Sequence, residues 1–237
     1  MNDISFNFLG KVVLVFGGSR GIGKEVCRQF AAAGAIVYNA SRTPVNLHLV
    51  RDLRCNLSRV EDIEFVFSKF DDIDFVINVA GTNLCEPIEN IDVEEWDRVM
   101  NVNLKSFFVI CKEAVNLMKR QNYGRIVNVS SIAGRNKSIV SGVHYTSSKY
   151  GIIGLTKQLA NEVSKHNILV NCVCPSQTMT EMLEKSMSKE AIEELEARIP
   201  VRRIATTKEQ AMPILFLCSN AASYISGAAI DVNGGQL

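Results

Sequence analysis

The chain has 237 residues, of which 47% are hydrophobic and 22% are charged, and its formal net charge is +1. A chain of this length and composition buries about 70% of its surface in a sizeable core, which excludes a disordered protein, a coiled coil and a collagen-like rod. So small a charge gives no general attraction to nucleic acid.

The seven cysteines lack the CxxC and Cys/His spacings that a zinc or redox site needs. We therefore expect reduced thiols in the core, no metal, and a cytoplasmic protein. Residues 1–10 lack the basic and apolar blocks of a signal peptide, and no later run reaches 18 apolar residues. The sequence predicts neither secretion nor a membrane span.

Short apolar runs alternate with amphipathic stretches from end to end. This alternation predicts an α/β fold, in which residues 1–237 form one domain with a Rossmann-like, doubly wound parallel seven-stranded sheet and helices on both faces. In chain order the pattern predicts strand 11–16, helix 23–33, strand 35–40, a weak strand 53–57, helix 60–70, strand 73–79, helix 93–121, strand 125–130, helix 145–165, strand 168–174, helix 180–198, helix 207–219 and strand 228–232. Because the stretch 43–51 is short, the helix before the weak strand is expected to be truncated.

A glycine-rich turn at 17–23 follows the first predicted strand and opens a helix. Bare backbone at glycines lets a pyrophosphate approach, while the free N–H groups and dipole of the helix start favour its negative charge. The spacing is G-x3-G-x-G and not G-x-G-x-x-G, yet its place between strand and helix predicts a dinucleotide site. The cofactor contacts predicted in this turn are Gly17, Ser19, Arg20, Gly21, Ile22 and Gly23.

Two arginines predict which dinucleotide binds. Sites for NAD place a carboxylate about 20 residues after the turn, on the ribose 2′-hydroxyl. This chain has no carboxylate from Val26 to Arg51, and its second strand ends at Ser41 and Arg42. A guanidinium offers a fork of donors to phosphate, so Arg42 and Arg20 predict NADPH/NADP+. The alternative is that both are solvated surface arginines.

Tyr145 and Lys149 are four residues apart at the start of a predicted helix, so their side chains share one face. A tyrosine ionises near pH 10, and about 4 kcal/mol of selective phenolate stabilisation brings this to neutral pH. A neighbouring ammonium can supply that stabilisation. Ser130 and Ser131 end the strand 125–130, where a hydroxyl would face the same crevice.

These motifs, in this order, are those of the short-chain dehydrogenases/reductases, which the chain resembles over nearly its whole length. The matching stretches are 17–23, 78–81, 101–104, 125–134, 145–149, 171–180 and 226–235. The resemblance implies that Tyr145 gives a proton to a carbonyl oxygen as hydride arrives from a nicotinamide. Lys149 would favour the phenolate and bind the nicotinamide ribose, and Ser131 would orient the carbonyl. Asn103 would hold a water that links Lys149 to solvent.

The resemblance also implies further cofactor contacts. They are Asn56 and Leu57 at the adenine, Asn78, Ala80 and Gly81 at the ribose side, and Pro175, Thr178 and Thr180 at the nicotinamide amide and phosphates. Two alternatives stay open: Ser130 could replace Ser131 as the reactive hydroxyl, and Asn103 could be an ordinary polar helix residue. His144, beside Tyr145, is a candidate acid–base residue, but we interpret it as a solvated histidine at a helix start.

Within the family, the stretches 199–203, 208–210 and 215–217 are similar to those of bacterial 3-oxoacyl-[acyl-carrier-protein] reductases. This implies a carbonyl reductase of fatty acid biosynthesis, and a homotetramer or homodimer. A basic rim of Lys119, Arg120, Arg125 and Lys165 would suit an acidic carrier protein, unless it is simply a solvated face. The other hypotheses are an NADP-dependent reductase of a small ketone, sugar or secondary metabolite, with 179–199 as a lid, and a non-catalytic dinucleotide-binding regulator.

Overall fold

The computed structural model describes residues 5–138, 140–186 and 188–237, apart from the side chains of residues 182, 185 and 186. Its strands are β1 (Val12–Phe16), β2 (Ile36–Ser41), β3 (Val50–Arg54), β4 (Phe75–Asn78), β5 (Gly124–Val129), β6 (Ile168–Pro175), β7 (Thr178–Met179), β8 (Ala205–Thr206) and β9 (Ala229–Val232). Its α-helices are α1 (Gly21–Ala32), α2 (Val60–Phe67), α3 (Val93–Met100), α4 (Ser106–Gln121), α5 (Val143–Val163), α6 (Glu181–Ser186), α7 (Lys189–Ala197) and α8 (Thr207–Cys218).

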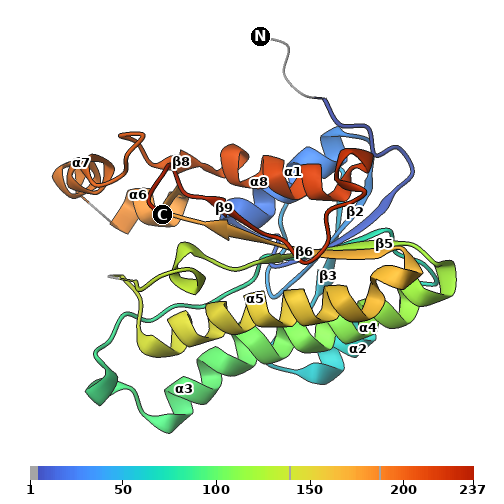
Figure 1. Ribbon diagram of the computed structural model, residues 1–237, viewed down its shortest axis with the longest axis horizontal. Coiled ribbons are helices and arrows are strands. Elements are labelled where there is room, and N and C mark those ends of the chain that lie inside the picture. Colours follow the sequence, from blue (N-terminus) through green and yellow to red (C-terminus); the bar gives the residue numbers. More distant parts are fainter. Residues whose placement is uncertain (1–4, 139, 187) are drawn as a thin grey trace.

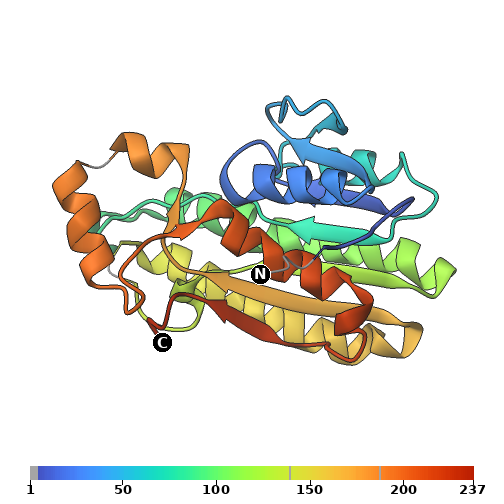
Figure 2. The same cartoon turned by 90° about the horizontal axis from the view of Figure 1, so that it is seen from above.

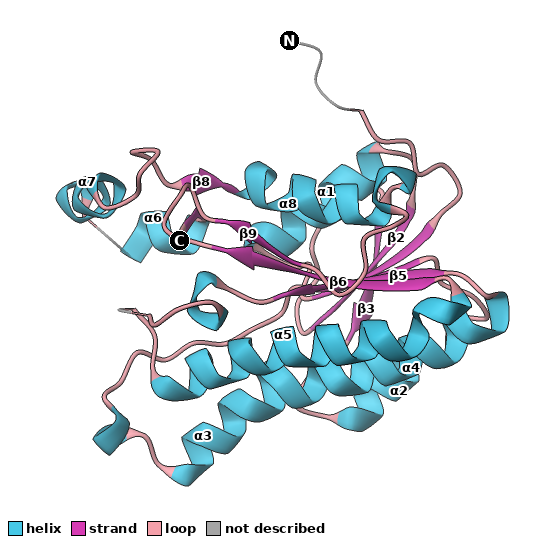
Figure 3. Ribbon diagram, viewed as in Figure 1, coloured by secondary structure: helices cyan, strands magenta, loops and turns pink. Residues whose placement is uncertain are grey.

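Seven strands form one parallel sheet in the order β3-β2-β1-β4-β5-β6-β9. The sheet runs between two layers of helices (Figure 3). The predicted fold class is confirmed. The order of the strands reverses between β1 and β4, and at such a point the connections leave a crevice beyond the carboxyl ends of the strands. The fold thus places the residues that follow β1, β4 and β5 around one opening.

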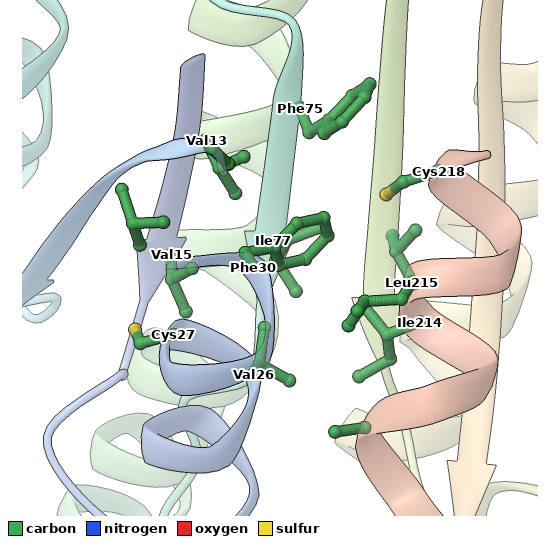
Figure 4. Close-up of a cluster of buried hydrophobic side chains, with 14 of the residues drawn as sticks. Val13, Val15, Val26, Cys27, Phe30, Phe75, Ile77, Ile214, Leu215 and Cys218 are labelled. Atoms are coloured by element: carbon green, nitrogen blue, oxygen red, sulfur yellow. The ribbon is translucent and has the colours of Figure 1, made fainter. Parts of the chain in front are cut away.

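Helices α1 and α8 cover one face of the sheet, and α2, α4 and α5 cover the other (Figures 1 and 2). On the first face, Val26 and Phe30 of α1 and Ile214 and Leu215 of α8 pack over Val15 and its neighbours in the sheet (Figure 4). Truncating a buried phenylalanine such as Phe30 to alanine would cost about 3–5 kcal/mol. This core fixes α1, whose first turn faces the crevice.

The connection from β2 to β3 has no helix within its described residues 42–49, so the predicted truncation is confirmed. Val45 is buried in its place, and Asp52 of β3 accepts hydrogen bonds from the Val45 N–H at 3.0 Å and the Asn39 side chain at 2.7 Å. The predicted bounds 53–57 of the weak strand were wrong, because β3 begins and ends three residues earlier, at Val50–Arg54. β3 is an edge strand, and its pairing with β2 places it at Val50–Arg54 although only Val50 is buried.

Two predicted helices are also modified. The helix 93–121 contains a π-helical turn, Asn101–Lys105, between α3 and α4. Such turns hold one extra residue and often occur at functional sites. The helix 180–198 is divided into α6 and α7, and the two-residue strands β7 and β8, which the sequence pattern does not show, pair beside them.

The cysteines lie in the core, with one exception: Cys85 is exposed, and the other six are buried. Burial raises the pKa of the Cys27 and Cys111 thiols to about 12, so both are protonated at neutral pH. Across the described ranges, no cluster of His, Cys, Asp and Glu could hold a metal ion. In those same ranges, no helix combines the length and the apolar character needed to cross a bilayer.

Candidate active site

A cavity of about 740 Å³ opens beyond the carboxyl ends of β1, β2, β4, β5 and β6. Most of the predicted site residues line it, although they come from all parts of the chain. The predicted residues in its wall are Gly17, Ser19, Arg20, Ile22, Gly23, Ser41, Arg42, Asn56, Leu57, Ala80, Gly81, Ser131, Tyr145, Lys149, Pro175 and Thr180.

The glycines of the turn are required by close backbone packing. Gly17 has φ +90°, and a Cβ there would lie 2.7 Å from the Cα of Ala80. A Cβ on Gly23 would lie 2.2 Å from the carbonyl oxygen of Gly17. Any side chain at these two positions would therefore push the turn away from β4 or from α1.

The start of α1 can bind an anion. Its N-cap residue, Arg20, makes no side-chain capping bond, and the first turn contains no acidic residue, all of it within the described chain. The first N–H groups of the helix therefore face the cavity with the positive end of the helix dipole. A diphosphate fits this position.

The charge of the cavity wall has one sign. Among the residues that the structure describes, the wall contains Arg20, Arg42, Arg98 and Lys149 but no Asp or Glu. Arg20 and Arg42 are exposed at the end of the cavity that lies beyond β1 and β2. Ser41 makes its own bonds there, since its hydroxyl donates to the Thr43 carbonyl at 2.6 Å and accepts from the Asn39 side chain. No hydrogen bond or ion pair with another described residue holds the Arg42 side chain, so its guanidinium can meet a phosphate.

The opposite wall holds the predicted catalytic pair. Lys149 is only 3% exposed, and its Nζ donates to the carbonyl oxygen of Val129 at 3.0 Å. That nitrogen lies 5.5 Å from the centre of the Tyr145 ring, so the two side chains share one face of α5 as their spacing predicted. Tyr145 is half-buried and lines the cavity.

The two serines after β5 have different surroundings. Ser130 is 3% exposed, and its hydroxyl donates to the main-chain carbonyl of Lys149 at 2.8 Å. Ser131 is half-buried, and its Oγ accepts a bond from the Ala133 N–H at 3.1 Å. The Ser130 hydroxyl thus uses its proton in a hydrogen bond to the α5 backbone, whereas no described residue accepts the Ser131 proton, which remains available to a ligand in the cavity.

Asn103 is fully buried inside the π-helical turn. Its Oδ1 accepts the Thr82 N–H at 2.8 Å, and its Nδ2 donates to the Thr82 carbonyl at 2.8 Å and to the hydroxyl of Ser148 at 3.2 Å. It is therefore no ordinary polar helix residue, because it braces the segment that follows β4. Oδ1 keeps one lone pair free.

The geometry agrees with the comparison to known families, in which residues 17–236 match the model described as enoyl-(acyl carrier protein) reductase. The chain belongs to the short-chain dehydrogenases/reductases. It is therefore an oxidoreductase of a family that uses NAD(P).

Individual members of the family are similar over almost their whole length. The chain is 35% identical to 3-oxoacyl-[acyl-carrier-protein] reductase FabG of Aquifex aeolicus (strain VF5), covering 96% of this chain and 97% of that protein. It is 34% identical to acetoacetyl-CoA reductase of Acinetobacter sp. (strain RA3849), covering 95% and 97%. A solved structure of ElxO, a tyrosine-to-phenylalanine variant with NADPH bound, is 26% identical with a TM-score of 0.89, covering 96% and 99%.

Four residues predicted from the family motifs do not line the cavity. Besides Asn103, they are Gly21, Asn78 and Thr178. Asn78 is fully buried and donates to the Asn128 side chain at 2.7 Å, so it joins β4 to β5 inside the core. Thr178 donates to the Ser176 carbonyl at 3.0 Å. Asn78 and Thr178 therefore lie outside the wall of the short-chain dehydrogenase/reductase site and support the strands and turns that form it.

Other wall residues were not predicted. Thr82, Arg98 and Val102 line the cavity on the side of α3 and the π-helical turn. Arg98 pairs with Glu95 through two bonds of 2.6 and 2.7 Å and reaches the Thr82 hydroxyl at 3.4 Å. Thr82 could have been found because it directly follows the 78–81 stretch, whereas nothing in the sequence indicates that α3 reaches the site.

Two sequence-based interpretations were wrong. His144 is not solvated: its side chain is 0% exposed. The basic rim is not continuous either, because Arg125 is 4% exposed and donates to the carbonyls of Gly124 and Asn167. Of the other cations of that rim, Lys119 and Arg120 lie in the last turn of α4, and Lys165 follows the end of α5. In Figure 1 the chain continues from these helix ends into the amino ends of β5 and β6, opposite the carboxyl ends at which the cavity opens.

Proposed function

We propose that this enzyme is an NADPH-dependent carbonyl reductase of 3-oxoacyl thioesters, most similar in its task to the 3-oxoacyl-[acyl-carrier-protein] reductases, with Tyr145 as general acid. The observation that carries the proposal is the buried ammonium of Lys149 beside the Tyr145 ring, in a cavity with a free serine hydroxyl and an anion-binding helix start. The two curated relatives are named for 3-oxoacyl-carrier and acetoacetyl-CoA reduction, and the shared chemistry is a 3-oxoacyl thioester.

The proton chemistry follows from the hydrogen bonds. NADPH, when bound, supplies a hydride to the carbonyl carbon. The Tyr145 hydroxyl gives its proton to the carbonyl oxygen, and the ammonium of Lys149 stabilises the phenolate that remains. Ser131 donates a hydrogen bond to the same oxygen, because its Oγ already accepts from Ala133 and its proton is free. Ser130 cannot take this role while it donates to Lys149.

Asn103 is proposed to hold a water molecule that relays protons between Lys149 and solvent. Both protons of its Nδ2 have partners, so a relay water toward Lys149 would bind the free lone pair of Oδ1. A Cβ on Gly81 would lie 3.5 Å from Lys149 Nζ and 3.6 Å from this Oδ1, so both atoms border the same small space.

The preference for NADPH rests on Arg20 and Arg42. Both arginines line the cavity after β1 and β2, and the described wall has no carboxylate to repel a 2′-phosphate or to bind a 2′-hydroxyl, which supports this preference. We expect Arg42→Ala to weaken NADPH binding by about tenfold and to leave NADH binding unchanged. Arg54→Ala, an exposed arginine of β3 outside the cavity wall, is the matched control. An unchanged NADPH to NADH affinity ratio in Arg42→Ala would refute the preference.

Activity is tested by the loss of NADPH absorbance with acetoacetyl-CoA, an acetoacetyl carrier protein and a panel of simple ketones and sugars. We expect turnover of the thioesters, and a loss of about 10²–10⁴-fold in kcat in Tyr145→Phe with unchanged NADPH affinity. Turnover of simple ketones or sugars alone would refute the thioester assignment. Tight NADPH binding with no turnover of any of these substrates would instead support the hypothesis of a non-catalytic dinucleotide-binding regulator.

Carrier docking is tested in the same assay. The exposed cations Lys119, Arg120 and Lys165 lie just before the amino ends of β5 and β6, opposite the end of the sheet that holds the cavity, so a carrier bound there on one chain would not reach Tyr145 of that chain. We expect the double variant Lys119→Glu/Arg120→Glu to leave kcat/KM unchanged for acetoacetyl-CoA, which needs no carrier protein. A selective loss for the carrier-bound substrate would show that this rim takes part in docking.

A further inference from the structure

His144 lies inside the protein, directly before Tyr145, and has a defined hydrogen bond. Its side chain is 0% exposed, and its Nδ1 accepts the main-chain N–H of Tyr145 at 2.8 Å. A ring nitrogen that accepts a hydrogen bond carries no proton, so the neutral ring carries its proton on Nε2. The ring is thus held as one tautomer against the backbone of the residue proposed as the general acid.

This bond replaces a missing helix cap. Helix α5 begins at Val143, and its N-cap residue is Gly142, which has no side chain to accept the N–H groups of the first turn. A Cβ on Gly142 would lie 2.6 Å from Cε1 and 3.0 Å from Nδ1 of His144. The glycine leaves room for the imidazole, and the imidazole accepts the N–H of Tyr145 that a usual cap would accept.

The other ring nitrogen faces α3. His144 Nε2 lies 3.7 Å from Oε1 of Glu95 and has no hydrogen-bond partner among the described residues. Both carboxylate oxygens of Glu95 accept bonds from Arg98, which keeps the pKa of Glu95 below its usual range and the group charged. A fixed negative charge opposite Nε2 favours the proton on that nitrogen, and so keeps Nδ1 free to accept.

The carbonyl of Tyr145 is held from the opposite side. It accepts the Ser148 hydroxyl at 2.6 Å, and the Ser148 Oγ accepts a bond from Asn103. Asn103 braces Thr82, and Thr82 accepts the bond from Arg98. A series of polar contacts thus links the N–H of Tyr145 to the carbonyl of the same residue. From the N–H it passes through His144, Glu95 and Arg98. It returns to the carbonyl through Thr82, Asn103 and Ser148.

We propose that His144 is a positioning residue, which fixes the backbone of Tyr145 through Nδ1 and so aims its hydroxyl between Lys149 and Ser131. This inference rests on the proposed function, since it concerns how Tyr145 is placed to give up its proton. A loose first turn of α5 would leave the cofactor site intact and would lower the rate of the chemical step.

Two near-isosteric variants separate the two ring nitrogens. His144→Asn places an amide oxygen where Nδ1 accepts the Tyr145 N–H, and His144→Gln places an amide nitrogen near Nε2 and leaves that N–H without its acceptor. We expect kcat close to the parent value in His144→Asn and a loss of about tenfold or more in His144→Gln. The KM for NADPH is expected to change little in either, because His144 is not among the described residues that line the cavity.

The control is His48→Gln, which changes an exposed histidine in the connection between β2 and β3 and is expected to behave as the parent. Parent-like kcat in His144→Gln, or an equal kcat loss in His144→Asn and His144→Gln, would overturn the positioning role. If His144→Gln does not fold, Gly142→Ala applies the same test, because its Cβ displaces the ring. A kcat loss in that variant with unchanged KM for NADPH supports the role, and parent-like kcat overturns it.

Tyr145→Phe, measured beside these variants, separates this inference from the proposed function. Activity retained in Tyr145→Phe would remove the general acid and with it the proposed function. An inactive Tyr145→Phe with a fully active His144→Gln would remove only the role of His144.

Discussion

The two walls of the cavity are built in different ways. The cofactor wall, residues 17–23 and 41–43, presents glycine backbone, an uncapped helix start and exposed arginines. The catalytic wall, formed by Ser130, Ser131, Tyr145 and Lys149, is supported from behind by the buried side chains of Asn103 and His144, which bond to main chain. A mobile anion needs donors and room, whereas a proton donor must be held in one place. Substitutions in the two walls should therefore fail in different ways.

The largest effect is expected at Lys149. Lys149→Met keeps most of the volume of the side chain but removes the ammonium beside Tyr145, so we expect kcat to fall by about 10²–10⁴-fold. The rate of NADPH oxidation measures this loss, and circular dichroism confirms that the fold is kept. Lys157→Met, an exposed lysine two turns further along α5, is the control. Equal loss in both variants would contradict a specific role for the Lys149 ammonium.

The cofactor wall should respond through shape instead. Gly23→Ala places a Cβ against the Gly17 carbonyl, so we expect NADPH affinity to fall by about 100-fold and the free energy of unfolding by about 1–3 kcal/mol. Gly21→Ala is the matched variant: its φ is +53°, but the nearest atom to a Cβ is 3.4 Å away. Its backbone strain should cost only about 1–2 kcal/mol. Titration with NADPH and urea unfolding compare the two, and equal losses of affinity would show that crowding at Gly23 is not decisive.

Removing a polar side chain that supports the catalytic wall from behind should affect stability and activity together. Asn103→Ala leaves the partly buried N–H and carbonyl of Thr82 without these partners, so the free energy of unfolding should fall by about 1–3 kcal/mol. Because Thr82 lines the cavity, kcat should fall as well. Urea unfolding and the oxidation assay test both. A stable but inactive variant would favour the relay role of Asn103 alone.

The smallest effect is expected away from both walls, at Glu209. Arg203 and the Thr206 backbone lower the pKa of this carboxylate to about 2, and Glu209 completes the capping box of α8. A folded-state pKa below the unfolded value stabilises the protein above about pH 4.5, and this stabilisation is lost as the pH falls toward 2.

Glu209→Gln should therefore lower the free energy of unfolding by about 1 kcal/mol at neutral pH, a small value because the pair is partly exposed. The difference from the parent should shrink between about pH 4.5 and 2. Urea unfolding at several pH values measures it, with Glu194→Gln at an exposed position of α7 as control. NADPH affinity at neutral pH should not change, and a loss of affinity would show that α8 is coupled to the cofactor wall.

Local patterns predicted the parts of the molecule that depend on local geometry. Tyr145 and Lys149 meet because residues four apart share a helix face, and Gly17 and Gly23 flank the start of α1 because only bare backbone fits at these two positions. The difference between Ser130 and Ser131 was not predictable, since it depends on which hydroxyl meets the Lys149 carbonyl from another element. The edge strand β3 was misplaced because its pairing with β2, and not its own apolar pattern, determines its bounds.

The sequence by itself determined the alternation of strands and helices, the turn that can hold a diphosphate, and the pairing of a tyrosine with a lysine. Each of these depends on residues close together in the chain, where spacing fixes geometry. Only the tertiary structure decided that Arg98 joins the cavity wall, that Arg125 is buried, and that His144, in the first turn of α5, is buried facing Glu95. Burial and charge pairing depend on which distant elements pack together, and no local pattern records that.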